Sequence, residues 1–164
     1  FAVDYFQFDA VLGQGRSKVY LANYESSRIA LKVADIAKHR EMLSELQNEV
    51  SVYEQLFALQ GSGIPRLVCH GYVEELLYCV GVSICGTVAN VFTEKQMNKL
   101  LDTLQNIHEF GILHNDIKKE NILIDEFGNP YIIDFGFSTR SCSPVAQKEE
   151  RNVLLRLVES TFNS

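Results

Sequence analysis

The hydrophobic pattern of this chain changes its period near residue 35, and this change restricts the folds that it can adopt. Residues 18–24 and 28–33 alternate between apolar and polar side chains, as half-buried strands do. Over residues 35–57 apolar side chains instead recur at every third or fourth position, which is the spacing of an amphipathic helix. Residues 6–12 indicate an earlier strand, so we expect an antiparallel meander followed by a helix over residues 35–57.

The rest of the chain adds short strands and two more helices. A capping box formed by Thr93 and Gln96 predicts a helix that Gly111 ends, and Pro144 precedes a final helix over residues 148–162. Short apolar runs predict four strands, of which the last two form a hairpin: residues 66–70, 76–82, 122–124 and 131–134. Strands that come first and helices that come later indicate an α+β arrangement.

Length and charge exclude several classes of protein. With 164 residues, 46% of them hydrophobic, the chain can bury the core of one compact domain or of two small lobes. A net charge of −6 without a basic stripe argues against nucleic acid and anionic membranes as partners. No apolar run approaches the roughly 20 residues of a membrane span. The 4 cysteines show no C-x-x-C spacing, so we expect reduced thiols and an intracellular protein.

Three features of the first third suit phosphate binding when they are taken together. Gly13 and Gly15 lie between two predicted strands, where a backbone without side chains can approach a polyphosphate, although a plain turn explains them equally well. Lys32 lies on an otherwise apolar strand and Glu49 on the following helix, and each alone fits a solvent-facing charge. Together they supply a cation for phosphate oxygens and a carboxylate that holds this cation.

The strongest chemical signal is the segment over residues 112–123. Asp116 and Asn121 stand five positions apart in a loop after a helix, and Asp134 opens the sequence Asp-Phe-Gly after a predicted strand. Phosphoryl transfer needs an aspartate that orients a hydroxyl, an asparagine and a second aspartate that ligate magnesium, and a lysine for the γ-phosphate. Turn formation would explain these polar residues one by one, but not their joint occurrence.

On these motifs the chain resembles the eukaryotic-like protein kinase family, from about residue 8 to residue 163. The resemblance implies that Asp116 is the catalytic aspartate and Lys118 its neighbouring lysine. It implies that Asn121 and Asp134 are ligands of Mg²⁺. It further implies a site for ATP, whose expected residues are Gly13, Gly15, Val19, Ala30, Lys32, Ser83 and Cys85.

The same resemblance implies a two-lobed α+β fold. An antiparallel N-terminal sheet and a helix C, whose Glu49 would pair with Lys32, form the first lobe, and a reduced, mainly helical part forms the second. We expect a single domain, shortened relative to the family. Its expected boundaries are residues 1–164 for the domain, about 1–82 for the N-terminal lobe, 83–86 for the hinge and 87–164 for the C-terminal lobe.

Three departures from the family pattern matter. Lys18 replaces the third glycine of the loop, and Asn115 replaces an arginine that in the family gathers a phosphorylated activation loop, so that route of switching is not expected. Few residues follow Gly136, and none of them matches the family's Ala-Pro-Glu motif. This brevity is similar to that of atypical kinases of the Bud32 and RIO kind and of short kinase-like proteins of fungi. It leaves room for a partner that completes the second lobe.

We therefore expect a phosphotransferase that uses ATP and Mg²⁺ and acts on Ser or Thr of a protein substrate. Lys118, two positions after Asp116, resembles the pattern of the protein kinases that act on Ser and Thr. A small-molecule kinase of the aminoglycoside or choline kinase type stays open, because the form His-Asn-Asp also occurs in those relatives. A pseudokinase-like scaffold that binds ATP without useful turnover is the third interpretation, since the short second lobe would suit it.

Overall fold

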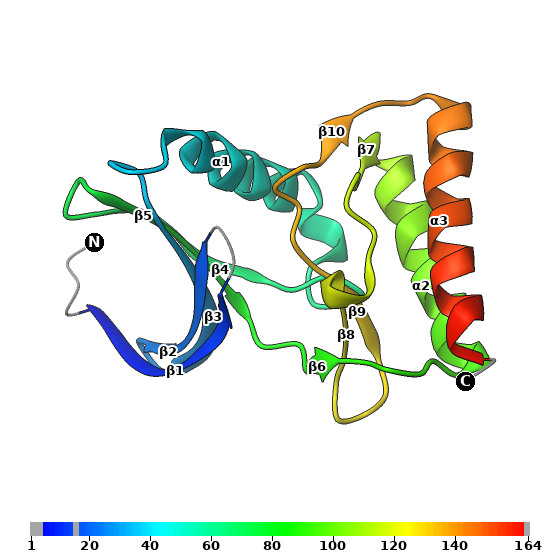
Figure 1. Ribbon diagram of the computed structural model, residues 1–164, viewed down its shortest axis with the longest axis horizontal. Helices are drawn as coiled ribbons and strands as arrows, with labels where there is room; N and C mark the ends of the chain where they lie inside the picture. The colour runs from blue at the N-terminus through cyan, green and yellow to red at the C-terminus, as the bar shows by residue number, and fades with distance from the viewer. Residues whose placement is uncertain (1–4, 15–16, 163–164) are drawn as a thin grey trace.

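The molecule has two parts, one built mainly from a β-sheet and the other mainly from helices. In the computed structural model, which describes residues 5–14 and 17–162, a β-sheet with helix α1 against it lies at one end, and helices α2 and α3 lie at the other (Figure 1). The chain passes between the two parts after β5 and enters the second part at β6. This arrangement confirms the α+β fold expected from the order of strands and helices.

An antiparallel sheet of five strands, in the order β1-β2-β3-β5-β4, forms the first part. Its strands are β1 (Phe6–Gln14), β2 (Lys18–Tyr24), β3 (Ser27–Asp35), β4 (Leu67–Val73) and β5 (Leu77–Ser83). The predicted end of β1 at residue 12 is wrong, because Gly13 and Gln14 still pair with Val19 and Lys18. Within the sheet Lys32 pairs with Val19 on one side and Val80 on the other, so these three side chains share a face.

Helix α1 (Arg40–Gln55) begins later than the predicted residue 35. Strand β3 continues to Asp35, whose carboxylate then accepts the backbone N–H groups of Ala37 and Lys38 at 3.2 and 3.1 Å. Such a turn competes with helix and delays its start. The apolar face of α1 packs on one face of the sheet in a cluster that contains Ala34, Met42, Leu46, Val50, Tyr78 and Val80.

The second part is built around α2 (Glu94–Glu109) and α3 (Pro144–Phe162), which pack against each other. Thr93 and Gln96 form the predicted capping box, and Gly111, at a φ of +72°, follows the end of α2. The short elements between the helices are β7 (Ile112–Leu113), the 3-10 turn η3 (Lys119–Asn121), β8 (Ile122–Ile124), β9 (Pro130–Ile132) and β10 (Thr139–Arg140). A further 3-10 turn, η2 (Phe57–Leu59), follows α1, and β6 (Thr87–Val88) precedes α2.

Strand β8 pairs with β9 as the predicted hairpin, with β6 on the other side of β8, while β7 pairs with β10. The predicted inclusion of Asp134 in the hairpin is wrong, because β9 ends at Ile132 and Asp134 has a φ of +68°, which no strand residue adopts. On α3, Leu154 and Val158 are buried, whereas Val153 is 38% exposed.

The largest apolar core lies mainly in the second part. It packs the end of α1 against α2, α3 and the short strands. Its fully buried members include Tyr53, Leu104, Ile112, Phe135 and Leu154. Because Phe135 follows Asp134 directly, the core fixes the backbone on which Asp134 is carried. Over residues 5–14 and 17–162 none of the helices is long and apolar enough to span a bilayer.

Candidate active site

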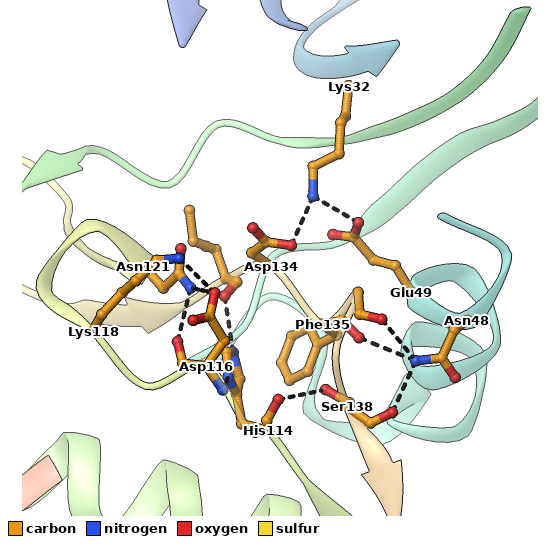
Figure 2. A network of polar contacts seen from close by, with 12 residues as sticks. Lys32, Asn48, Glu49, His114, Asp116, Lys118, Asn121, Asp134, Phe135 and Ser138 are labelled. Carbon is orange, nitrogen blue, oxygen red and sulfur yellow. Dashed lines mark hydrogen bonds and ion pairs between the residues drawn. The ribbon is translucent and has the colours of Figure 1, made fainter. Parts of the chain in front are cut away.

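Three charged side chains from three distant elements meet between the two parts of the molecule. The ammonium of Lys32, on β3, lies 2.7 Å from Oε2 of Glu49 on α1 and 2.9 Å from Oδ1 of Asp134 after β9 (Figure 2). The Lys32 side chain is 17% exposed and the Glu49 side chain 4%. The sequence predicted Lys32, Glu49 and Asp134 to share one site, and the structure brings them together.

Lys32 and Asp134 each stabilise the charged form of the other. Burial alone would lower the pKa of Lys32, but Glu49 and Asp134 outweigh it and raise that pKa above its ordinary value. Burial likewise raises the pKa of the Glu49 carboxyl, against the opposing effect of Lys32. Burial would raise the pKa of Asp134 too, yet Lys32 and the Gly136 N–H together lower it. At neutral pH the cluster therefore holds a firmly charged ammonium beside an ionised Asp134.

Asp116, Lys118 and Asn121 form a second polar group on one short loop. The Lys118 ammonium lies 2.6 Å from Oδ2 of Asp116, and the amide of Asn121 donates to the same oxygen at 2.9 Å. The Asn121 amide also donates to the backbone oxygen of Asp116 at 2.8 Å. These contacts close the loop on itself and fix the direction of the Asp116 carboxylate.

His114 connects this loop with the backbone just before Asp134. Its Nδ1 accepts the backbone N–H of Asp116 at 3.2 Å, and its Nε2 donates to the backbone oxygen of Ile133 at 2.9 Å. The ring also packs on Phe135, with centroids 5.0 Å apart. Complete burial lowers the pKa of His114, which keeps the ring neutral in the tautomer that both contacts require. These contacts give His114 a structural role behind the loop.

Glu150, a residue that the sequence analysis missed, supports the loop from α3. Its carboxylate accepts the backbone N–H groups of His114 and Asn115 at 3.1 and 2.6 Å. It also accepts a hydrogen bond from Nε2 of His108, on α2, at 2.7 Å. Burial would raise the pKa of Glu150, but these three donors lower it, so the group is ionised although it is only 8% exposed.

The backbone after Asp134 is held from two sides by amide side chains. Asn48 of α1 donates to the backbone oxygens of Gly136 and Ser138 at 3.1 and 2.9 Å. Asn115, at a φ of +65°, donates to the oxygen of Phe137 at 3.0 Å and to Oγ1 of Thr139 at 2.8 Å. The sequence analysis noted Asn115 only as a departure from the family pattern and gave Asn48 no role.

The remaining predicted residues lie along the sheet and the linker after it. Ala30 pairs with Val82 across β3 and β5, on the face that carries Lys32, and Gly13 lies opposite Val19. Gly15 falls outside the described residues.

Ser83 ends β5, and its hydroxyl accepts the backbone N–H of Arg66 at 2.9 Å. Cys85 is buried, with its thiol donating to the Ser83 oxygen at 3.5 Å. The side chains of Ser83 and Cys85 are thus occupied within the protein. The Ser83 backbone N–H is also bonded within the protein, to the Arg66 oxygen at 2.9 Å.

A groove lies beside the Asp116 carboxylate, between the loop and α3. Its volume is about 340 Å³, and it is lined by Leu113, Asn115, Asp116, Ile117, Ala146, Glu149, Glu150 and Val153. Both apolar and polar groups line it. No group of three or more His, Cys, Asp or Glu residues able to hold a metal ion occurs among the described residues.

Asn121 and Asp134 nevertheless offer the oxygen donors that a hard cation prefers. The Asn121 amide nitrogen is directed at Asp116, which leaves its oxygen as the atom for a ligand. A carboxylate has several lone pairs, so Asp134 can hold Lys32 and a cation together. Magnesium commonly takes one or two such protein groups and completes its shell with water and phosphate oxygens. The residues present therefore fit Mg²⁺.

Comparisons with known proteins agree with this geometry. The family model described as protein kinase domain matches residues 6–153. A probable cAMP-dependent protein kinase catalytic subunit of Encephalitozoon cuniculi is 29% identical over 150 residues, which cover 81% of this chain and 46% of that protein. A probable casein kinase I homolog of the same organism is 31% identical over 137 residues, which cover 76% of this chain and 42% of that protein.

The serine/threonine-protein kinase grp of Drosophila melanogaster is 28% identical over 136 residues, which cover 76% of this chain and 26% of that protein. This chain thus spans less than half the length of each of these relatives. The matches concern the family as a whole. They do not bear on the narrower likeness to kinases of the Bud32 and RIO kind.

Proposed function

Because the chain belongs to the protein kinase family, we propose that it transfers the γ-phosphate of ATP to a Ser or Thr hydroxyl of a protein substrate. The observation that carries the proposal is the contact of Lys32 with both Glu49 and Asp134. This contact gathers a cation for phosphate oxygens and an acidic group for a metal ion at one point, although the residues lie far apart in the sequence. Phosphoryl transfer depends mainly on such positioning and charge neutralisation.

Each residue then has a defined part in the transfer. Asp116 accepts the proton of the substrate hydroxyl while the hydroxyl oxygen attacks the γ-phosphorus and the bond from phosphorus to the bridging oxygen of ADP breaks. Lys118, which already holds Asp116, stabilises the charge that develops on the transferred phosphoryl group. Lys32 holds phosphate oxygens of ATP and is itself held by Glu49.

Two further assignments complete the nucleotide site. Asn121 and Asp134 would hold Mg²⁺, which when bound neutralises phosphate charge. The backbone of Ser83 and Cys85 would meet the adenine, with Val19 and Ala30 against its ring and Gly13 and Gly15 over the phosphates. These roles, and the division of the chain at residues 83–86, stay predictions.

A protein acceptor is favoured over a small molecule by Lys118. Its position two residues after Asp116 resembles the pattern of the Ser/Thr protein kinases, and its ammonium contacts the Asp116 carboxylate. The groove beside Asp116 has the mixed lining that a peptide segment around the acceptor residue requires. A partner protein that completes the short second lobe belongs to the same proposal.

The test is transfer of labelled phosphate from ATP to a generic protein substrate, with Mg²⁺ and with EDTA. The parent chain is compared with Asp116→Asn and Asp134→Asn, and we expect both variants to lose about 10²–10⁴-fold in rate. Gln105→Ala, an exposed change on α2, serves as the control. Binding of ATP by a parent chain that transfers no more phosphate than the variants would contradict the proposal and favour the scaffold. Transfer to aminoglycosides or choline but not to protein would favour the small-molecule kinase.

A further inference from the structure

The amide side chain of Asn48 binds the backbone that follows Asp134 to α1. Asn48 donates to the oxygens of Gly136 and Ser138 at 3.1 and 2.9 Å, and its nitrogen lies 3.5 Å from the oxygen of Phe135. The two shorter contacts are ordinary hydrogen bonds and the third is long. The two hydrogens of one amide group are thus shared among carbonyls of the turn that carries Asp134 (Figure 2).

Arg140 fixes the direction in which the Asn48 amide points. Its Nη1 donates to Oδ1 of Asn48 at 3.1 Å, and its Nη2 donates to Oγ of Ser51 at 2.7 Å. Because a guanidinium can only donate, Oδ1 must face Arg140 and the amide nitrogen must face the carbonyls. Asn48 therefore links α1 to Gly136 at the start of residues 136–140 and to Arg140 at their end, with its amide held in one orientation.

The position of Asn48 next to Glu49 connects this bridge with the charged cluster. Glu49 faces Lys32 and accepts a hydrogen bond from the Phe135 backbone N–H, which opposes the rise in pKa that burial causes. Asn48 and Glu49, which are consecutive residues of α1, thus bind carbonyl groups and an N–H group of the same turn. The turn needs such support, because Asp134 has a φ of +68°, a conformation that is costly for a residue other than glycine.

We propose that Asn48 is a positioning residue of phosphoryl transfer, which keeps the Asp134 turn against α1 so that Asp134 stays beside Lys32. The proposal rests on the proposed function only for its catalytic consequence. Asn48 would act through Asp134 and Glu49 and not through a contact with the protein substrate. Its loss should therefore weaken the hold on nucleotide and lower kcat, while KM for the protein acceptor stays unchanged.

The test compares Asn48→Ala and Asn48→Asp with the parent chain. Asn48→Asp keeps the shape but turns an oxygen toward the carbonyls, so it separates hydrogen bonding from packing. Gln47→Ala, an exposed change one position earlier on α1, is the matched control. Amide hydrogen exchange of residues 135–140, the affinity for Mg²⁺ with ADP, and kcat are measured for each protein.

Both Asn48 variants should exchange residues 135–140 about tenfold faster, bind Mg²⁺ with ADP about tenfold more weakly and lose about tenfold in kcat, while Gln47→Ala matches the parent. Arg140→Ala, which loses the bond that orients the amide together with the bond to Ser51, should show the same changes at about threefold and serves if Asn48→Ala fails to fold. An Asn48→Asp protein that exchanges and binds like the parent would overturn the proposal. Exchange and ADP binding need no turnover, so they decide the role of Asn48 even where the parent transfers no phosphate and the proposed function fails.

Discussion

The two polar groups of the candidate site are built in opposite ways. Lys32, Glu49 and Asp134 come from three elements, and the Lys32 and Asp134 positions are separated by most of the chain. Asp116, Lys118 and Asn121 instead belong to one loop and contact one another within six positions. Lys32 and Glu49 are largely buried, whereas the Lys118 side chain is 47% exposed. The pair of Lys32 and Glu49 should therefore carry stability as well as chemistry, and Lys118 chemistry alone.

Replacing Lys32 should have the largest effect. Lys32→Met leaves the buried Glu49 and the neighbouring Asp134 without their cation, which should cost about 3 kcal/mol of unfolding free energy. Transfer should fall about 10²–10³-fold, because phosphate oxygens lose their ammonium. Urea unfolding and initial rates check both, with Lys38→Met, an exposed lysine paired to Asp35, as the control. A Lys32→Met protein as stable as the control would remove the contrast between the two groups.

The next effect concerns the support of the local group. Glu150→Ala leaves the backbone N–H groups of His114 and Asn115 without an acceptor, which should cost about 2 kcal/mol of stability. Glu150→Gln keeps an accepting oxygen and should lose about half as much. Thermal and urea unfolding measure the difference, and the exposed neighbour change Glu149→Ala should be neutral. Equal stability of Glu150→Ala and Glu149→Ala would show that the loop holds itself.

A pH dependence follows from the buried ring of His114. Burial lowers its pKa below the ordinary value of 6.5, so the unfolded chain takes up a proton more readily than the folded one. The contribution of His114 to stability is complete above pH 6.5 and is lost as the pH falls from there through the lowered pKa. The difference in unfolding free energy between the parent and His114→Phe should therefore shrink below pH 6.5. A difference that stays constant from pH 7.5 to pH 5 would contradict a neutral His114.

The smallest effect on stability is expected at Lys118. Its ion pair with Asp116 is half exposed, so Lys118→Met should change the unfolding free energy by less than about 1 kcal/mol. Transfer should still fall by about 10²-fold, because the ammonium serves the reaction rather than the fold. The ratio of the activity effect to the stability effect thus separates Lys118 from Lys32. A loss of stability as large as that of Lys32→Met would mean that both groups are structural.

The sequence predicted these two groups on different grounds. Asp116 and Asn121 could be predicted from residues alone, since spacing within one loop already places them near each other, whereas Lys118 followed from the resemblance to a family. The contact of Lys32 with Asp134 followed only from the combination of motifs and the resemblance to a family, because no local pattern specifies a contact between β3 and the end of β9. Strand β2 and the capping box of α2 were predicted correctly, since alternation and capping are local signals.

What the sequence missed are polar side chains that bind backbone. Glu150 lies among charged neighbours on α3, where a solvated helix face is the ordinary expectation, and Asn48 lies on the polar side of α1. Their partners are backbone carbonyl and N–H groups, which are common to nearly all residues. The residue types in the sequence therefore do not indicate these contacts. The start of α1 and the end of β9 were missed for a related reason, since the Asp35 turn and the positive φ of Asp134 depend on local hydrogen bonds and tertiary packing.

The central claim is that the long-range group and the local group serve one nucleotide. The direct measurement is a crystal structure of the chain with Mg²⁺ and a non-hydrolysable ATP analogue. The account predicts phosphate oxygens on Lys32 and a metal ion held by both Asn121 and Asp134, with Asp116 facing the γ-phosphate. A nucleotide bound away from Lys32, or a metal ion that binds neither Asn121 nor Asp134, would contradict it.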